Sequence, residues 1–316
     1  MESEQQMSKQ LREFQEHLKK SKKIVALVGA GLSVSSGLPT FRGSQGLWKN
    51  FNMIDLATPD AFYIDPGLVW QFYSWRRVSA LKARPNRGHL ALSKLSNLSS
   101  NRDNGKKVDY ITITQNVDGL SSRSNHCKDN LYEIHGSLFN LKCTSFMCNY
   151  VDRNNFKHPL TKALADTEDE YEKKNRKRTL EEIEQQDLSI SPQFKPVVQL
   201  TESDLPQCPV CKDGSLLRPG VVWFGESLPL NVITKIDNFI ESETPVDLVL
   251  VIGTSGTVYP ANSYVDRIKL KGGKVAIFNT DIEEDILQGK VKDTWGFRGD
   301  AAELLPVALE PLIGEI

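Results

Sequence analysis

Residues 23–42 read KIVALVGAGLSVSSGLPTFR, an apolar run followed at once by a loop with three glycines, four small hydroxyl residues, a proline and an arginine. Gly29 and Gly31 would let the backbone turn tightly and approach a phosphate, and a helix that begins near Ser33 would direct its amides toward it. Val34 takes the place of the third glycine of GxGxxG, and no Lys-Ser/Thr pair follows, which excludes a P-loop. Alone, the loop fits equally well as an ordinary tight turn.

Four further apolar runs lie at residues 108–114 (VDYITIT), 220–225 (GVVWFG), 247–253 (DLVLVIG) and 274–279 (KVAIFN). Helical patterns separate these runs, which predicts an α/β protein with a mostly parallel sheet buried on both faces. We expect a doubly wound, Rossmann-like arrangement. A polar or glycine cluster follows each run, and ligands of such sheets bind beyond the carboxyl ends of the strands, so the clusters predict one shared crevice.

The chain has 316 residues and a formal net charge of -1 at pH 7. This charge gives no bulk attraction to nucleic acid or an anionic membrane, and no run of 18 apolar residues is present to span one. We therefore expect neither among the partners, and we expect a monomer. Residues 1–20 lack the apolar segment of a secretory signal and are too acidic for a good mitochondrial presequence. We expect a short polar helix there, and a mitochondrial or a cytoplasmic or nuclear location.

Four of the five cysteines form two close pairs. Cys143 and Cys148 have four residues between them, and Cys208 and Cys211 have two. Both spacings suit one tetrahedral Cys₄ zinc site, which would be structural, in a reducing compartment. The alternative is four unrelated thiols. Cys127 is left over and is interpreted as a loop thiol.

Six motifs occur in order along the chain: GAGLSVSSGLPTFRG from residue 29, TQNVDGL from 114, EIHGSLF from 133, GVVWFGE from 220, GTSGTVYPA from 253 and FNTD from 278. In this order and context they resemble the sirtuins, the NAD-dependent protein lysine deacylases. The resemblance covers about residues 20–305, apart from an almost wholly charged insert at 167–187. The first cysteine pair departs from the family, which usually has two residues inside each pair.

The resemblance implies that NAD is a co-substrate bound at the glycine loop. Gln115, Asn116 and Asp118 match the positions around the nicotinamide and its ribose, and His135 matches the general base, with Asn116 beside it in the catalytic group. Without the resemblance, the polar turn would be interpreted as local backbone bonding and the histidine as structural. The residues expected to bind NAD are Gly29, Ala30, Gly31, Ser33, Thr40, Phe41, Arg42, Trp48, Gln115, Asn116, Val117, Asp118, Gly253, Thr254, Ser255, Asn279, Thr280, Asp281 and Ala301.

In the implied reaction, the acyl oxygen of an acylated lysine attacks the ribose carbon of NAD that bears nicotinamide, and nicotinamide leaves. His135 accepts a proton from the ribose hydroxyl system, which suits an imidazole whose pKa lies near the working pH. Water completes the release of free lysine and O-acyl-ADP-ribose. The partner is therefore an acylated lysine side chain of a protein, on an extended peptide that pairs with residues 220–226 through main-chain hydrogen bonds.

Tyr73 and Arg76 lie three residues apart, hence on one face of a helix. Sirtuins that remove succinyl, malonyl or glutaryl groups carry this pair, and a guanidinium there would bind the distal carboxylate. Ala57 is small enough to leave room, whereas Met53 narrows the pocket. The alternative is a surface arginine packed over an aromatic ring. The residues expected to bind substrate are Tyr73, Arg76, Ala57, Val221, Val222, Trp223, Phe224 and Gly225.

The expected activity is thus removal of acidic acyl groups, and more weakly of acetyl groups, from lysine. Alternatives are a general deacetylase, a mono-ADP-ribosyltransferase or a non-enzymatic NAD sensor, although a sensor needs no base at His135. We expect a helical extension at residues 1–20. Residues 21–141 and 213–316 are expected to form the NAD-binding domain, and residues 142–212 a zinc-binding module that carries the charged insert.

Overall fold

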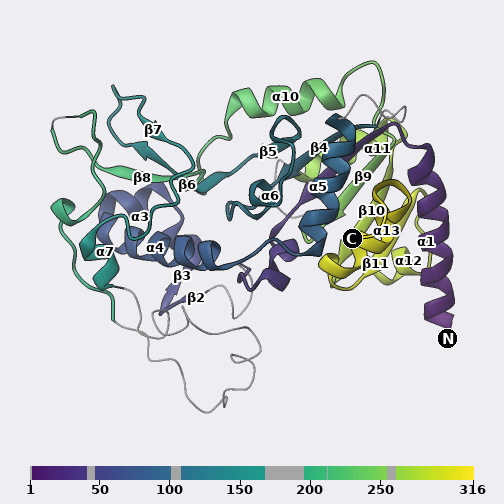
Figure 1. The fold of residues 1–316 in the computed structure, drawn as a ribbon, viewed down its shortest axis with the longest axis horizontal. Coiled ribbons are helices and arrows are strands. Elements are labelled where there is room, and N and C mark those ends of the chain that lie inside the picture. Colours follow the sequence, from purple (N-terminus) through teal and green to yellow (C-terminus); the bar gives the residue numbers. More distant parts are fainter. Residues whose placement is uncertain (1, 41–46, 101–107, 168–195, 212, 255–260) are drawn as a thin grey trace, which may run out of the picture. The chain divides into compact units, whose positions relative to one another are not determined.

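A computed structural model of the chain describes residues 2–40, 47–100, 108–167, 196–211, 213–254 and 261–316 (Figure 1). The chain divides into two compact units. The first consists of Met1–Thr40, Lys82–Ser137 and Ser227–Ile316, and the second of Phe41–Leu81 and Leu138–Glu226.

A six-stranded sheet, parallel in every pair, forms the centre of the first unit, as the sequence predicts. Its strands are β1 (Lys23–Val28), β4 (Asp109–Thr114), β5 (Leu131–Glu133), β9 (Leu248–Ile252), β10 (Lys274–Asn279) and β11 (Thr294–Arg298). The order across the sheet is β11-β10-β9-β1-β4-β5. From β1 the chain adds β4 and β5 on one side and later β9, β10 and β11 on the other, so the strand order reverses between β1 and β9. This is the doubly wound arrangement, in which ligands bind at the reversal.

The register brings the carboxyl ends of the central strands level. Val28, the last residue of β1, lies opposite Thr114 of β4 on one side and Ile252 of β9 on the other. The loops that follow these three strands therefore leave the sheet at one edge, which places the glycine loop beside the turns that begin at Gln115 and Gly253.

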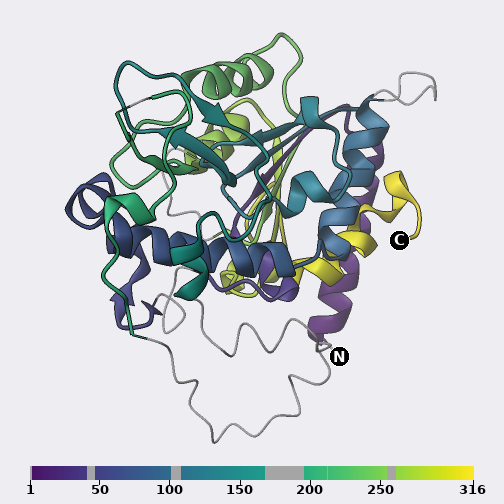
Figure 2. The ribbon, with the colours of Figure 1, turned by 60° about the vertical axis from the view of Figure 1, so that its left-hand side comes forward.

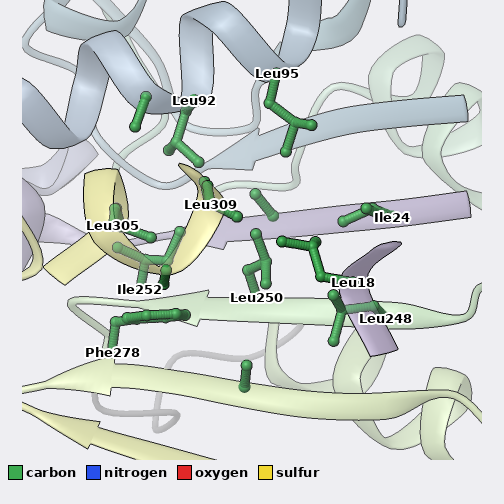
Figure 3. Close-up of a cluster of buried hydrophobic side chains, with 14 of the residues drawn as sticks. Leu18, Ile24, Leu92, Leu95, Leu248, Leu250, Ile252, Phe278, Leu305 and Leu309 are labelled. Carbon is green, nitrogen blue, oxygen red and sulfur yellow. The ribbon is translucent and has the colours of Figure 1, made fainter. Parts of the chain in front are cut away.

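Helices cover both faces of this sheet, because its strands are apolar on both faces. Ile24, Ala26 and Val28 belong to one buried cluster, whereas Val25 and Leu27 belong to the other. Figure 3 shows the first cluster, to which α1 (Glu2–Lys20), α5 (Arg87–Ser100) and α13 (Ala301–Ile313) contribute. The helices α10 (Leu230–Ile240) and α11 (Ala261–Leu270) contribute to the second. Figure 2 shows the ribbon with helices on both sides of this sheet. Short helices complete the unit: η1 (Ala30–Ser36), α6 (Leu120–Arg123), η4 (Lys128–Asn130) and α12 (Glu284–Leu287).

The N-terminal helix α1 is part of the core and not a free polar extension. Phe14 and Leu18 are fully buried, one turn apart on the same face. The Phe14 ring meets the rings of Trp295 and Phe297 edge-on, at centroid distances of 5.7 and 5.4 Å. The buried Gln10 accepts a hydrogen bond from the amide of Gly296 at 2.9 Å, so α1 is joined to β11 by polar as well as apolar contacts.

The second unit contains a three-stranded sheet in the order β7-β6-β8. Its strands are β6 (Gly136–Cys143), β7 (Val151–Asp152) and β8 (Leu217–Val221), and β2 (Leu47–Trp48) pairs with β3 (Phe51–Asn52) in a small antiparallel ribbon. Its helices are α2 (Met53–Leu56), α3 (Pro59–Ile64), α4 (Pro66–Lys82), α7 (Lys162–Asp166) and η6 (Glu202–Asp204).

Three expectations need correction. The run at 220–225 is not a strand of the parallel sheet, because β8 ends at Val221 and pairs within the second unit. The expected helix near Ser33 is a 3₁₀ helix that already begins at Ala30. The strands β5 and β11 were not anticipated, since β5 has only three residues and β11 contains a glycine and an arginine.

The division into units also differs from the expected boundaries, because α4 and the segment before it belong to the second unit. The indole of Trp70 donates to the carbonyl of Leu217 at 2.9 Å, and the buried guanidinium of Arg77 donates to the carbonyls of Leu138 and Asn155. These bonds join α4 to β6 and β8. The charged insert lies outside the described residues apart from Thr167. Over the residues described, no helix combines the length and the apolar character that crossing a membrane requires.

Replacing Phe14 by alanine should lower the free energy of unfolding by about 3–5 kcal/mol, because the cavity would open against the rings of Phe278, Trp295 and Phe297. The matched control is Glu13→Ala, an exposed neighbour on the same helix that should stay within about 0.5 kcal/mol of the parent chain. Denaturant titration of the two variants measures the difference. Equal stability of the two would show that α1 lies outside the cooperative core.

Candidate active site

The glycine loop touches the end of β9 backbone to backbone. The amides of Gly29 and Gly31 donate to the carbonyls of Ile252 and Gly253, both at 2.8 Å. A Cβ on Gly31 would lie 2.6 Å from the Cα of Gly253, and a Cβ on Gly253 would lie 2.5 Å from the amide nitrogen of Leu32. Gly253 also has a φ of +56°, which side chains disfavour. The approach therefore requires glycine on both sides.

A polar network extends from this loop to the turn after β4. The side-chain amide of Asn116 donates to the carbonyl of Gly29 at 3.0 Å and to the hydroxyl of Ser33 at 3.2 Å. The Ser33 hydroxyl in turn donates to the carboxylate of Asp118 at 2.7 Å. The alternative interpretation, in which the polar side chains of this turn bond only the local backbone, holds for one bond: Asp118 accepts from the amide of Leu120 at 2.8 Å.

His135 follows β5 and is held in one protonation pattern. Its Nδ1 lies 3.0 Å from the carbonyl oxygen of Gln115. A carbonyl can only accept, so Nδ1 carries the proton and Nε2 keeps a lone pair. Burial lowers the pKa of His135 below its ordinary value, and the bond to Gln115 opposes that shift. At neutral pH this side chain is therefore an uncharged base.

Sequence reasoning missed two ionisable groups near Asp118. His89, on α5, is buried, and its Nε2 has no hydrogen-bond partner among the described residues. Burial lowers the pKa of His89 to about 4, against the charge of Asp118. Burial, and then the charge of Asp118, raises the pKa of Glu133 to about 7. The sequence pattern around His89 predicts only the start of a helix. There the side chain of Asn86 accepts hydrogen bonds from the amides of Gly88 and His89.

Only some of the remaining residues that were predicted to bind NAD lie next to the turns described above. The side chain of Asn279 donates to the carbonyl of Thr254 at 3.1 Å, which ties the turn after β10 to the turn after β9. Thr280 and Asp281 are exposed, and Ala301 is buried at the start of α13. Phe41, Arg42 and Ser255 lie outside the described residues. The other predicted positions in the first unit lie on the glycine loop or the turn after β4: Ala30, Thr40 and Val117.

In the second unit, Tyr73 and Arg76 lie together on α4. Tyr73 is 1% exposed, and the guanidinium carbon of Arg76 is 5.5 Å from its ring centroid. Burial raises the pKa of Tyr73, and the nearby charge of Arg76 opposes that shift, so the phenol keeps its proton at neutral pH. Trp48, expected to contact NAD, packs on Phe72 with ring centroids 5.6 Å apart.

The segment after β8 is closed by an ion pair. Arg218 binds both carboxylate oxygens of Glu226, at 2.6 and 2.9 Å, and Glu226 also accepts from the amide of Trp223 at 2.8 Å. The amide of Phe224 donates to the carbonyl of Ala57 at 3.0 Å, which brings two predicted substrate positions together. Three further positions flank them: buried Val221, half-buried Val222, and exposed Gly225, which has a φ of +87°.

The four paired cysteines converge, as predicted. Their sulfurs all lie within 4.8 Å of one another, with 3.6 Å between Cys143 and Cys211 and 3.8 Å between Cys148 and Cys208. Four sulfurs at about 2.3 Å from a tetrahedral zinc ion are separated by about 3.8 Å. The thiols are too far apart for disulfides. The donor set fits one structural zinc ion, and the longer first knuckle does not prevent it.

Comparison with known proteins agrees with this geometry. The Sir2 family model matches residues 29–260. An NAD-dependent protein deacylase of Candida albicans is 74% identical over 98% of this chain and all of that protein. The mitochondrial NAD-dependent protein deacylase sirtuin-5 of Canis lupus familiaris is 38% identical over 96% of this chain and 86% of that protein. A solved Sir2 homologue in complex with NAD has a TM-score of 0.68 at 33% identity, covering 95% of this chain and 92% of that chain.

Freshly purified protein should contain one zinc ion per chain by elemental analysis. Cys208→Ala should lose the metal and melt at a lower temperature, because binding of a structural metal contributes to the free energy of folding. Cys127→Ala is the matched control, since this thiol lies outside the cluster, and it should keep both metal and melting temperature. Zinc-free protein with an unaltered melting temperature would contradict the assignment.

Proposed function

Because the chain belongs to the Sir2 family of NAD-dependent protein deacylases, we propose that it removes succinyl, malonyl or glutaryl groups from lysine side chains, and acetyl groups more weakly. The observation that carries the acyl preference is the pair on α4 formed by the buried Tyr73 and the half-buried Arg76. One relative is named sirtuin-5. The sequence resembles sirtuins that act on acidic acyl groups in carrying a tyrosine and an arginine at this spacing.

The glycine loop and its neighbours fit NAD. The glycine loop follows β1 at the strand reversal, where ligands of doubly wound sheets bind. The amides of Gly29 and Gly31 are bonded to the end of β9, so they fix the position of the loop. The Nε2 of His89, which has no hydrogen-bond partner within the described part of the chain, offers a polar contact to a bound ligand, since buried polar atoms otherwise find partners. When bound, NAD supplies an electrophilic ribose carbon with nicotinamide as the leaving group.

His135 acts in this proposal as the general base. Its Nε2 lone pair can accept a proton from a ribose hydroxyl, while the bond from Nδ1 to the Gln115 carbonyl holds the ring in place. The lowered pKa keeps the base uncharged at neutral pH. Asn116 holds the loop and the serine hydroxyl in position through its two donated bonds.

Tyr73 and Arg76 would recognise the distal carboxylate of the acyl group. A phenol that keeps its proton and a guanidinium are both donors, and two donors side by side match a carboxylate. An acetyl group offers no acceptor at that position, and the desolvation of Arg76 would then go uncompensated. The two donors therefore favour acidic acyl groups over acetyl.

His135→Ala should abolish turnover, with a loss of ~10²–10⁴-fold in kcat, because the proton acceptor is gone. Binding of NAD, measured by calorimetry, and the melting temperature should stay close to those of the parent chain, since His135 is not part of the core. Retention of more than a tenth of the parent rate would remove His135 from the role of base.

Arg76→Met should lower kcat/KM for a succinyl-lysine peptide by about 10- to 100-fold relative to the matching acetyl-lysine peptide, because a charge-assisted hydrogen bond contributes about 1.5–3 kcal/mol. Most of the change should appear in KM. Tyr73→Phe should act in the same direction but less, because it removes one neutral hydroxyl.

Arg84→Met is the control for loss of positive charge, because Arg84 is exposed and lies just beyond α4. It should change both peptides little. An equal loss for both peptides in Arg76→Met would assign Arg76 to the fold or to peptide binding, and the enzyme would be a general deacetylase.

A further inference from the structure

The side chain of Trp223 makes a buried hydrogen bond whose direction is unambiguous. Its Nε1 lies 2.9 Å from the hydroxyl oxygen of Tyr73, and the side chains of both residues are at most 2% exposed. An indole nitrogen can only donate, so the Tyr73 oxygen is the acceptor. The proton of the Tyr73 hydroxyl must therefore point away from Trp223.

Arg76 strengthens this constraint from another side. Its guanidinium, which has only donors, lies beside Tyr73, with the guanidinium carbon 5.5 Å from the centroid of the Tyr73 ring. Neither the indole nitrogen of Trp223 nor the guanidinium of Arg76 can accept a hydrogen bond, so the proton of the Tyr73 hydroxyl can go only to another group. Free phenol hydroxyls rotate between partners, whereas this one is left with a single kind of partner.

The indole itself has little freedom. The guanidinium carbon of Arg218 lies 3.5 Å from the centroid of the Trp223 ring, and the ring of Phe62 packs on it at 5.3 Å. The backbone amide of Trp223 donates to Glu226, which the same Arg218 binds through both oxygens. These contacts, all within the second unit, hold the indole N–H of Trp223 in position to donate to Tyr73.

We propose that Trp223 is a positioning residue for acyl-group recognition, whose indole N–H directs the Tyr73 hydroxyl proton toward the carboxylate of an acidic acyl group. This rests on the proposed preference for acidic acyl groups. The sequence predicts main-chain pairing of Trp223 with the substrate peptide, and the hydrogen bond to Tyr73 adds a role for its side chain. Because an acetyl methyl group has no acceptor, the directed proton favours only substrates that carry a distal carboxylate.

The test is a double-mutant cycle of Trp223→Phe and Tyr73→Phe, with kcat and KM measured for succinyl- and acetyl-lysine peptides of one sequence. Trp223→Phe keeps an aromatic ring and removes the donor. The succinyl-to-acetyl ratio of kcat/KM should fall by about 2- to 12-fold, the range for one neutral hydrogen bond, with the change in the succinyl KM. In the Tyr73→Phe background the same substitution should leave the ratio unchanged, because its target is absent.

An unchanged ratio in Trp223→Phe would overturn the proposal, and so would a fall of equal size in the Tyr73→Phe background, because the indole would then act through packing. If the phenylalanine variant does not fold, site-specific benzothienylalanine at position 223 keeps the bicyclic ring and replaces the N–H by sulfur. The same fall in ratio is expected, and its absence overturns the proposal.

Arg76→Met separates this proposal from the proposed function. A selective loss of succinyl activity in Arg76→Met together with an unchanged Trp223→Phe overturns only the role of Trp223. Equal losses for both peptides in Arg76→Met, with no succinyl preference in the parent chain, overturn the acyl preference itself and the role of Trp223 with it.

Discussion

The backbone contact between Gly31 and Gly253 is the constraint on which the first unit depends. It lies at the point where the order of the parallel sheet reverses between β1 and β9, and a Cβ on either residue would overlap backbone atoms of the other loop. On its other side, the glycine loop meets the turn after β4: the carbonyl of Gly29 accepts from Asn116, and the hydroxyl of Ser33 donates to Asp118. The level strand ends and the three glycines together bring the turns after β1, β4 and β9 into contact.

Burial shifts the pKa values of three ionisable groups in the first unit. It lowers the pKa values of His89 and His135 and raises the pKa of Glu133 to about 7. In the second unit, burial likewise keeps the phenol of Tyr73 protonated. The first unit thus offers an uncharged base at His135, and the second unit offers the neutral phenol of Tyr73 beside the cationic Arg76, as the proposed deacylation of an acidic acyl-lysine requires.

Features with a strong local pattern could be predicted from the sequence: four of the five apolar runs as parallel strands, the glycine loop and the cysteine pairs. The run at 220–225 could not, because short apolar runs do not reveal which sheet they join. The docking of α1 depends on Phe14 and Leu18, two apolar residues in a polar helix. His89 and the side chain of Trp223 depend on contacts with residues distant in sequence, Asp118 and Tyr73, which no local pattern contains.

The most direct test of this account is the stoichiometry of nicotinamide release. Purified protein with NAD and a succinyl-lysine peptide should release one nicotinamide for each lysine deacylated, and the acyl group should be recovered on ADP-ribose. Release should be negligible without the acylated peptide. Nicotinamide release that needs no acyl-lysine, with ADP-ribose recovered on a protein side chain, would instead identify a mono-ADP-ribosyltransferase and contradict the account.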